Sequence, residues 1–306
     1  MPAACYGILG RRLKRVSDRI AKVGLLANSN KPGSRALVQS TSRLIQRTGR
    51  KLLCDAPTAQ LAELKCQSVV NAATLARHVD LLLVFGGDGT MLRIARDVAN
   101  SQTPILGVKV GGLGFLTTVQ AQHISEALKQ IWEGEFLVES RPLIEAIGCA
   151  QGKTISELAL NDFVISRGAT SRLIELAVTV DAVELTRYRC DGLIVSSPTG
   201  STAYSLAAGG AVVSPDAEVL TITPICPHTL SNRSVIVRMD AMVQVTVMSE
   251  KVDTMLTADG QVQLPLSTGD FVQIRKSKSA VRLLRLRGSS FFQTLRQKLH
   301  WSGSHV

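Results

Sequence analysis

The sequence has few aromatic and few charged residues. Aromatic residues make up 4% of its 306 residues and charged residues 19%, whereas hydrophobic residues make up 45%. The core must therefore consist mainly of Leu, Val, Ile and Ala rather than large rings. The chain is longer than one average domain, which predicts about two domains of ordinary globular composition.

Features that would indicate metal sites, disulfides or membranes are also missing. The six cysteines include no C-x-x-C pair and the five histidines are scattered, so neither a zinc site nor a disulfide framework is expected. No apolar run reaches the ~18 residues that a membrane-spanning helix needs. The first 20 residues are basic but lack the apolar core of a secretory signal. We therefore expect a cytoplasmic protein with no membrane partner.

The positive charge is concentrated at the two ends of the chain. Of the net charge of +11, residues 1–20 carry +4 and residues 275–306 carry +8, which leaves −1 for the residues between them. Many proteins that bind single-stranded nucleic acid have aromatic residues interleaved with basic ones, and this sequence has no such pattern. We expect no nucleic-acid partner, and phosphorylated metabolites are the favoured anions.

The first half of the chain alternates strand and helix patterns. Short apolar runs separated by amphipathic stretches predict a doubly wound parallel sheet, in an α/β domain over residues 21–135 that follows a basic extension at residues 1–20. The expected strands are 22–27, 51–54, 80–85 and 104–108, and the expected helices are 34–48 and 90–98.

After about residue 135 the pattern changes to short β-branched runs between turn signals. This predicts a β-rich, sandwich-like domain over residues 136–280. Its expected strands are 159–166, 173–180, 193–197, 219–223, 235–238, 242–248, 252–257 and 271–274, with one helix at 201–208. In the last segment, 281–306, an amphipathic helix at 290–299 is expected to dock on the body through Phe291, Phe292, Leu295 and Leu299.

The most informative segment is a buried strand that runs into Gly86, Gly87, Asp88, Gly89 and Thr90. Glycines remove Cβ atoms, so the backbone can adopt positive φ and approach a ligand, and the following helix N-terminus favours an anion. The segment is neither a Walker A loop nor a dinucleotide fingerprint. It predicts a phosphate-binding turn with Asp88 as the reactive group. The alternative is a tight turn in which Asp88 caps the helix.

Three other segments qualify as parts of a site, each with a structural alternative. A second glycine turn at 111–117 follows the next strand, so both turns would face one cleft, although it could be a plain turn. Residues 191–205 are rich in hydroxyl groups that can bind ribose and amides, with Tyr204 as a stacking face, or they form a capped helix start. The pair Asn161 and Asp162 begins an apolar strand and is otherwise a turn pair.

Together these segments resemble the NAD kinases, also called ATP-NAD kinases, over residues 22–303. The shared motifs are GGDGT at 86–90, GLGFLT at 112–117, ND at 161–162, DGLIVSSPTGSTAYSLAAGG at 191–210, TPICPHTLSNRS at 223–234 and, as in bacterial members, FFQTLRQKLHWSG at 291–303. GGDGT also occurs in lipid kinases and phosphofructokinases, whereas the block at 191–210 together with TPICPHTLS is specific.

The resemblance implies phosphorylation of the adenosine ribose 2′-hydroxyl of NAD, which yields NADP. ATP is the implied donor, with polyphosphate as an alternative, and a divalent metal, Mg²⁺, is the implied cofactor. The resemblance also implies an N-terminal α/β domain, a C-terminal β-rich domain, NAD at their junction, and a homodimer or homotetramer.

The resemblance assigns roles to individual positions. Asp88 becomes the proton acceptor, with Gly86, Gly87, Gly89 and Thr90 as the phosphate loop. The implied NAD-binding residues are Asp88, Gly89, Arg93, Asn161, Asp162, Arg172, Arg189, Asp191, Thr199, Thr202, Ala203, Tyr204, Ser205, Leu206, Ala207 and Gln261. Within this set, Asn161 and Asp162 hold ribose hydroxyls and Asp191 reaches the nicotinamide. No protein side chain is assigned to the metal.

The sequence departs from the family pattern at three places. Asp162 stands where Glu is common, which shortens the side chain by one methylene, and Gly111 and Gly112 stand where Asn often precedes LGFL. Arg172 occupies a position that is His in some members. Residues 1–20 match nothing in the pattern.

A carboxylate is a much weaker base than an alkoxide, so Asp88 would accept the proton while the O–P bond forms. Phosphoryl transfer depends mainly on positioning and on cationic groups around the phosphates. Two other functions use the same loop: a lipid kinase, which leaves the hydroxyl-rich segment unexplained, and a nucleotide sensor in which Asp88 is only a helix cap.

Overall fold

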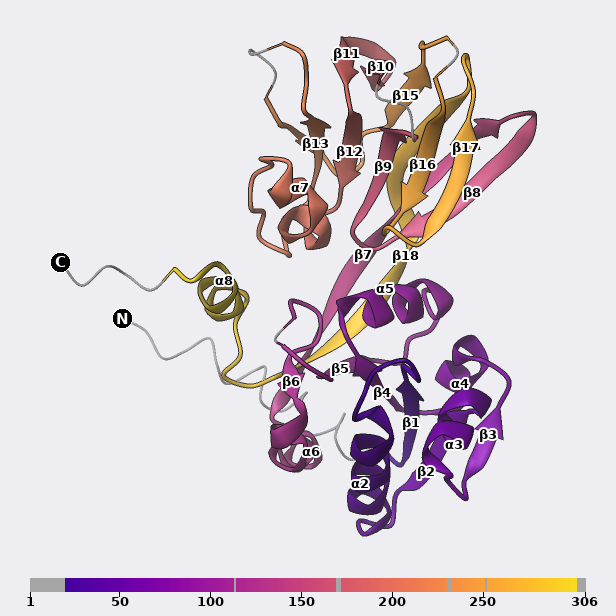
Figure 1. The fold of residues 1–306 in the computed structure, drawn as a ribbon. Coiled ribbons are helices and arrows are strands. Elements are labelled where there is room, and N and C mark those ends of the chain that lie inside the picture. Colours follow the sequence, from indigo (N-terminus) through magenta and orange to yellow (C-terminus); the bar gives the residue numbers. More distant parts are fainter. Residues whose placement is uncertain (1–19, 113, 169–171, 230–232, 251, 302–306) are drawn as a thin grey trace, which may run out of the picture. The chain divides into compact units, whose positions relative to one another are not determined.

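The computed structural model describes residues 20–112, 114–168, 172–229, 233–250 and 252–301 (Figure 1). The chain forms two compact units, which are treated separately below. The first unit comprises Met1–Ser140 and Val281–Val306, and the second comprises Arg141–Ala280. The limits of the functional domains remain predictions.

The first unit contains a parallel sheet with the strand order β5-β4-β1-β2-β3, as the alternating pattern predicted. Its strands are β1 (Lys22–Ala27), β2 (Lys51–Asp55), β3 (Gln67–Val69), β4 (Leu81–Gly86) and β5 (Ile105–Lys109), with the short β6 (Val119–Gln120) beside β5. Its helices are α2 (Ser34–Gln46), α3 (Ala56–Ala62), α4 (Ala72–His78), α5 (Asp88–Asp97), α6 (Ile124–Glu133) and α8 (Phe291–Leu299).

The strand order determines where a ligand site can form in this sheet. After β1 the chain continues to β2 on one side, and β4 then pairs with β1 on the other side. This reversal makes the carboxyl ends of β1 and β4 a topological switch point, where open α/β sheets bind ligands. All six residues of β4 are buried, so its sequence is apolar throughout. The GGDGT segment begins at this point.

Several boundaries in the first unit differ from those predicted. The helix expected to start at Thr90 begins at Asp88, because Gly87 already serves as its N-cap residue with a φ of −112°. The three glycines of the GGDGT loop do not adopt the expected positive φ. In the second glycine turn, Gly111 does have a positive φ, of 107°. The helices α3, α4 and α6 and the strand β3 were not predicted. The first two helices and β3 are seven residues or fewer, too short for a clear periodic pattern.

The second unit is a sandwich of two largely antiparallel sheets that share one core, as predicted. One sheet has the order β14-β13-β12-β9-β16-β17, and the other includes β11-β10-β15-β18. Core residues come from both, for example Phe163 and Val195 from the first and Leu176 and Val245 from the second. The bounds are β8 (Lys153–Ala159), β9 (Asp162–Arg167), β10 (Ile174–Val180), β11 (Val183–Cys190), β12 (Gly192–Ser196), β13 (Val219–Ile225), β14 (Val235–Arg238), β15 (Val243–Val247), β16 (Thr254–Ala258) and β17 (Val262–Leu266).

Two strands are much longer than the sequence pattern indicated. The strand β7 (Phe136–Ala150) was not predicted, and β18 (Phe271–Leu286) extends twelve residues beyond the expected end at Ile274. Both strands carry charged side chains, and Arg275 pairs with Glu145 at 2.7 Å while Arg285 pairs with Glu139 at 2.6 Å. The charged residues interrupt the alternation of apolar and polar residues from which strands are predicted. The strands β8, β11 and β17 were also missed.

Two expected helices change in the structure. The helix predicted at 201–208 is two short segments, η2 (Thr199–Thr202) and α7 (Tyr204–Ala207), because Ala203 adopts a φ of −101° and a ψ of −127°. The helix α8 begins after Ser290, whose hydroxyl accepts a hydrogen bond from the Gln293 amide at 3.1 Å. Leu295 is buried, but Phe292 is 60% exposed, so Phe292 does not belong to the packed face.

Candidate active site

Asp88 links the two glycine turns of the first unit. It is the first residue of α5, directly after the end of β4, and its carboxylate points to the second turn rather than to its own helix. Oδ2 accepts the Phe115 amide at 2.8 Å, and Oδ1 accepts the amides of Leu116 at 3.3 Å and Thr117 at 3.2 Å and the Thr117 hydroxyl at 3.0 Å. The helix-cap alternative is therefore wrong, since Gly87 is the N-cap residue and no side chain caps the helix.

The second glycine turn is shaped to receive this carboxylate. A Cβ atom at Gly114 would lie 2.0 Å from Asp88 Oδ1, so only glycine allows the observed approach. The strands before the two turns are neighbours, with Gly86 paired to Lys109, and the Val110 amide donates to the Gly86 carbonyl at 3.0 Å. The prediction that both turns lie at one edge of the sheet is confirmed. The plain-turn alternative does not explain the contacts to Asp88.

Three lysines that the sequence analysis did not single out lie near one another, and one of them, Lys109, interacts with Asp88. The ammonium of Lys109, at the end of β5, lies 3.6 Å from the Cβ position of Gly87. Burial lowers the pKa of Lys109, and the charges of Lys298 in α8 and Lys31 after β1 lower it further, while Asp88 opposes this change. The Lys298 ammonium also lies 5.8 Å from the Phe115 ring centroid. We call Lys31, Lys109 and Lys298 the lysine cluster. The three lysines lie far apart in sequence, so no local sequence motif could have predicted the cluster.

The remaining predicted residues of the first unit have different surroundings. Thr90 is buried, and its hydroxyl accepts a hydrogen bond from the Asn28 amide group at 3.1 Å, which joins the loops after β1 and β4. Arg93 lies on the exposed side of α5, 3.7 Å from Asp97. Gly89 lies within the first turn of α5. Asn28 was missed by the sequence analysis because a single asparagine after a strand reads as a loop residue.

In the second unit, Asn161 and Asp162 lie where the sequence placed them, at the head of an apolar strand. Asp162 begins β9, pairs with Ser196 of β12 and is 4% exposed. Its burial, and then the negative charge of Asp259, raise the pKa of Asp162 to about 7. Asp259 was missed by the sequence analysis. A nearly neutral pKa makes Asp162 able to donate or accept a hydrogen bond near physiological pH.

The hydroxyl-rich segment divides into an inner and an outer set of side chains. The inner hydroxyls are fully buried and bonded within the protein, so they cannot form the expected binding wall: Ser196, Ser197, Ser201 and Ser205. Ser205, a predicted NAD-binding residue, shares a hydrogen bond with Thr223 at 3.2 Å. The Gly200 amide donates to the Ser197 hydroxyl at 3.2 Å, which resembles the capping alternative.

The outer set provides the accessible surface. Tyr204 is 49% exposed, which leaves its ring available for stacking. The other predicted residues of η2 and α7 are half-buried or exposed: Thr199, Thr202, Ala203, Leu206 and Ala207. A binding wall built from this segment therefore uses the threonines, the alanines and the tyrosine rather than the serines.

The last predicted residues lie at the ends of strands or in turns. Asp191, between β11 and β12, accepts a hydrogen bond from Arg167 Nε at 2.7 Å, and both side chains are about one-third exposed. Arg189, Arg172 and Gln261 are exposed. The structure thus brings the predicted residues into two groups, Asp88 with the glycine turns in one unit and Asn161 to Ala207 in the other.

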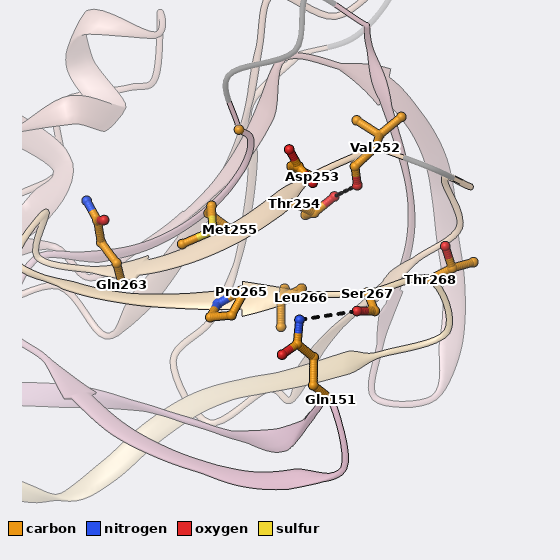
Figure 2. Close-up of a pocket in the computed structure, with 11 residues that line it drawn as sticks. Gln151, Val252, Asp253, Thr254, Met255, Gln263, Pro265, Leu266, Ser267 and Thr268 are labelled. Carbon is orange, nitrogen blue, oxygen red and sulfur yellow. Dashed lines mark hydrogen bonds between the residues drawn. The ribbon is translucent and has the colours of Figure 1, made fainter.

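Two cavities within single units contain none of the predicted site residues. The cavity in Figure 2 has a volume of about 570 Å³ and is lined by Gln151, Asp253, Thr254, Gln263, Ser267 and their neighbours. Its residues lie at the Thr254 end of β16, whereas Asp259 follows the opposite end of that strand. The second cavity, of about 390 Å³, lies among α6, β6 and α8. Neither cavity is lined by a pair of carboxylates.

Within the described ranges, no three His, Cys, Asp or Glu side chains gather as metal ligands, and no helix is both long and apolar enough to cross a membrane. The cysteines described are free, with the sulfur atoms of Cys54 and Cys66 2.7 Å apart. The motif positions Leu113, 230–232 and 302–303 lie outside the described residues.

Comparison with known proteins connects both groups of residues to one family. The models of the ATP-NAD kinase N-terminal and C-terminal domains match residues 23–136 and 160–286. The NAD kinase of Syntrophotalea carbinolica is 38% identical over 92% of this chain and 98% of its own length. That of Moorella thermoacetica is 39% identical over 92% of this chain and 90% of its own length.

Solved structures agree with these matches. An NAD kinase from Archaeoglobus fulgidus in complex with ATP has a TM-score of 0.72 and 26% identity over 91% of this chain and 98% of its own. Yeast NADH kinase complexed with NADH has a TM-score of 0.85 and 24% identity, and the match covers 94% of this chain and 89% of the yeast chain. This likeness shows the shared fold. The matches support NAD kinase activity with ATP as donor, and a lipid kinase sharing only the GGDGT loop would not give them. The chain belongs to the ATP-NAD kinase family.

Proposed function

We propose that this NAD kinase uses Asp88 to accept the proton of the ribose 2′-hydroxyl while the γ-phosphoryl group of ATP is transferred to that oxygen. The observation that carries this proposal is the fixed carboxylate of Asp88, held by three amides and one hydroxyl at the helix N-terminus after β4. A side chain held in this way can meet a reacting hydroxyl in one geometry, which is the main protein contribution in phosphoryl transfer.

The two oxygens of Asp88 differ in what they can still accept. A carboxylate oxygen has about two lone-pair directions. Among the described residues, Oδ1 receives three hydrogen bonds, whereas Oδ2 receives one, from Phe115. Oδ2 is therefore the oxygen proposed to take the proton, and Oδ1 anchors the side chain.

The donor phosphates are proposed to bind at the glycine loop and the lysine cluster. The N-terminus of α5 presents amides and a partial positive charge to an anion, and the three ammonium groups supply charge that the loop lacks. The same groups would accept polyphosphate, which shares the phosphoanhydride chemistry of ATP. The choice between these donors is tested by measuring NADP formation with each.

A divalent cation, Mg²⁺, is the proposed cofactor. Mg²⁺ is commonly held by substrate phosphates and one or two carboxylates, which fits described residues that offer no cluster of three ligands. When bound, the ion neutralises charge on the phosphates. The chain's own contribution is to orient the phosphates through the loop amides and the lysines.

The second unit is proposed to bind NAD. Asn161 and Asp162 would bind ribose hydroxyls, Tyr204 with Thr199, Thr202, Ala203 and Ala207 would contact adenine and the amide, and Asp191 would reach the nicotinamide. The exposure of Tyr204 and the partly exposed ion pair of Arg167 with Asp191 support these roles. The Tyr204 ring is accessible, and the ion pair fixes the Asp191 carboxylate. Arg172, Arg189 and Gln261 would contribute from the surrounding loops.

Two further properties are proposed from the family. The protein is expected to form a homodimer or homotetramer, which light scattering of the purified protein would measure. It is expected to reside in the cytoplasm, which fractionation of cells that produce it would test.

The decisive experiment compares Asp88→Asn with the unchanged protein in a coupled assay of NADP formation. We expect NAD to bind with similar affinity in calorimetry while kcat falls by about 10² to 10⁴, the range for a positioned proton acceptor. Thr117→Val serves as the control, because it removes one hydrogen bond but keeps the carboxylate. Activity near the original level in Asp88→Asn would refute the proton-acceptor role, and NAD binding without turnover in the unchanged protein would favour the sensor alternative.

A further inference from the structure

Asp259 lies in the tight turn that connects β16 to β17. The Gln261 amide donates to the Ala258 carbonyl at 2.9 Å, and the two central residues, Asp259 and Gly260, have φ values of 50° and 65°. Two consecutive positive φ values define a turn of type I′, for which Asp-Gly is a preferred sequence. The turn fixes the backbone of Asp259, and its side chain is 8% exposed.

The carboxylate of Asp259 holds the backbone of the Asn161 segment. Oδ1 accepts the amides of Asn161 at 2.8 Å and Asp162 at 3.3 Å, and Oδ2 accepts the amide of Leu160 at 3.1 Å. In return, the Asp259 amide donates to the Asp162 carbonyl at 3.0 Å. Asp259 thus forms four hydrogen bonds to three consecutive residues at the start of β9, in a distant part of the sequence.

The other side of this segment is held by the end of β12. The Ser197 amide donates to the Asn161 carbonyl at 2.8 Å, and the Ser197 hydroxyl donates to the Leu160 carbonyl at 2.5 Å. A Cβ atom at Gly200 would lie 2.2 Å from the Asn161 carbonyl oxygen, so the segment packs closely against η2. The backbone of Asn161 and Asp162 is therefore fixed from both sides, and the carboxylate that holds it is that of Asp259.

We propose that Asp259 is a positioning residue for NAD binding, which holds the Asn161 and Asp162 side chains in the geometry that the ribose requires. The inference rests on the proposed NAD role of that pair and goes beyond it, because Asp259 itself need not touch NAD. A carboxylate that accepts several backbone amides makes strong, charge-assisted hydrogen bonds and leaves little freedom to the backbone it holds.

Asp259 has a second effect on the same pair through its charge. Its proximity disfavours ionisation of the Asp162 carboxyl, so removal of that charge lowers the pKa of Asp162. If ionised Asp162 accepts a hydrogen bond from a ribose hydroxyl, NAD binding weakens as the pH falls through the range in which Asp162 gains a proton. This gives the positioning role a signature that a general loss of stability does not produce.

The test is the KM for NAD of Asp259→Asn, measured between pH 5.5 and 9. We expect KM to rise about tenfold, the factor that corresponds to about 1.4 kcal/mol, with kcat changed less than about threefold. The acidic limb of the KM profile should move to lower pH, and this movement should vanish in the Asp162→Asn background. An unchanged KM, or a lower kcat with no change in KM, would overturn the proposal.

Asp270→Asn is the matched control. Asp270 also accepts two backbone amides, from Gln151 at 3.0 Å and Ser267 at 2.7 Å, but it lies in the turn between β17 and β18, away from Asn161. Its replacement should leave the KM for NAD and its pH profile unchanged. Equal effects of both replacements would show that Asp259 acts only through stability, which contradicts the proposal.

A second variant keeps the test informative if Asp259→Asn does not fold. Gly260→Ala strains the turn through its positive φ, while nothing lies within 4 Å of the new Cβ atom and the carboxylate charge remains. A KM for NAD raised about threefold with an unmoved pH profile would support positioning, and an unchanged KM would refute it. If Asn161→Ala and Asp162→Asn themselves leave KM unchanged, the proposed NAD role of the pair fails, independently of Asp259.

Discussion

At the scale of single residues, Asp88 and Asp162 show how surroundings give the same side chain different chemistry. Asp88 accepts hydrogen bonds from three amides and one hydroxyl, which hold its carboxylate in one position. Asp162 is buried next to a second carboxylate, Asp259, which favours its neutral form. The sequence identified both residues as site candidates but contained no information about these environments.

The buried Asp162 should make the stability of the protein depend on pH. Its folded-state pKa of about 7 lies above that of an unfolded aspartate, so the folded protein binds the extra proton between about pH 4 and 7. Its contribution is therefore favourable at low pH and is lost as the pH rises through 7. Asp162→Asn should raise the free energy of unfolding by about 1–3 kcal/mol at pH 8 and by much less at pH 5. Urea denaturation at both pH values measures this, and a larger gain at pH 5 would contradict it.

Lys109 should matter for the phosphoryl donor. Lys109→Gln removes one charge of the lysine cluster beside the glycine loop, so the KM for ATP should rise about tenfold, as expected for the loss of about 1.4 kcal/mol. The KM for NAD should change little. Steady-state kinetics with each substrate varied in turn would show the difference. Lys129→Gln, on the exposed side of α6, is the control, and an equal effect there would indicate a general electrostatic contribution.

At the scale of elements, the active-site carboxylate depends on the fit between the α5 N-terminus and the turn after β5. The two strands are adjacent and parallel, so their carboxyl ends bring the turns together. The sequence analysis predicted this edge correctly from two apolar strands that each end in glycines. It did not predict that the second turn binds Asp88, since that contact depends on the distance between separate loops.

Gly114→Ala should impair catalysis through this contact. The new Cβ atom would lie 2.0 Å from Asp88 Oδ1 and 2.4 Å from the Thr117 hydroxyl, so the carboxylate must move. A displacement of about 1 Å can cost about 10² in rate, and we expect kcat to fall by about that factor. Gly112→Ala, with nothing within 4 Å of its Cβ position, should retain activity. NADP assays of both proteins, with thermal unfolding as a folding control, decide this, and similar losses in both would argue against the mechanism.

At the scale of the whole molecule, the chain combines a parallel sheet unit with an antiparallel sandwich unit. The first provides the helix N-terminus, the Asp88 carboxylate that we propose as the proton acceptor, and cationic groups, which suit phosphate chemistry. The second provides hydroxyl, amide and aromatic side chains on rigid strand ends, which suit recognition of a nucleoside. This division agrees with the models of the N-terminal and C-terminal domains of the family, which match residues 23–136 and 160–286.

Removal of divalent metal should separate binding from reaction. With a chelator in excess, NADP formation should fall by at least about 10², because charge on the transferred phosphoryl group is no longer neutralised. NAD binding to the second unit should change less than about threefold, as measured by calorimetry. Added Mg²⁺ should restore activity. Full activity in the chelator would contradict the proposed cofactor.

The sequence by itself determined the fold class, the family and the motifs of the site. Short apolar strands such as β4 and the turn residues around Asp88 carry strong local signals, because a strand buried on both faces must be apolar and a tight turn needs glycine. The charged strand β7 and the part of β18 after Ile274 escaped prediction, since their salt bridges join residues more than a hundred positions apart.

Only the tertiary structure decided which polar groups act on which. It placed Lys109 beside Asp88 and close to Lys31 and Lys298, turned the serines of the 191–205 segment inward, and set Asp259 on the backbone of Asn161. Hydrogen bonds and charge effects depend on distances of a few ångströms between segments that the chain separates by tens to hundreds of residues. Local sequence determines which residues are available for chemistry, and packing determines their partners, their protonation and therefore their roles.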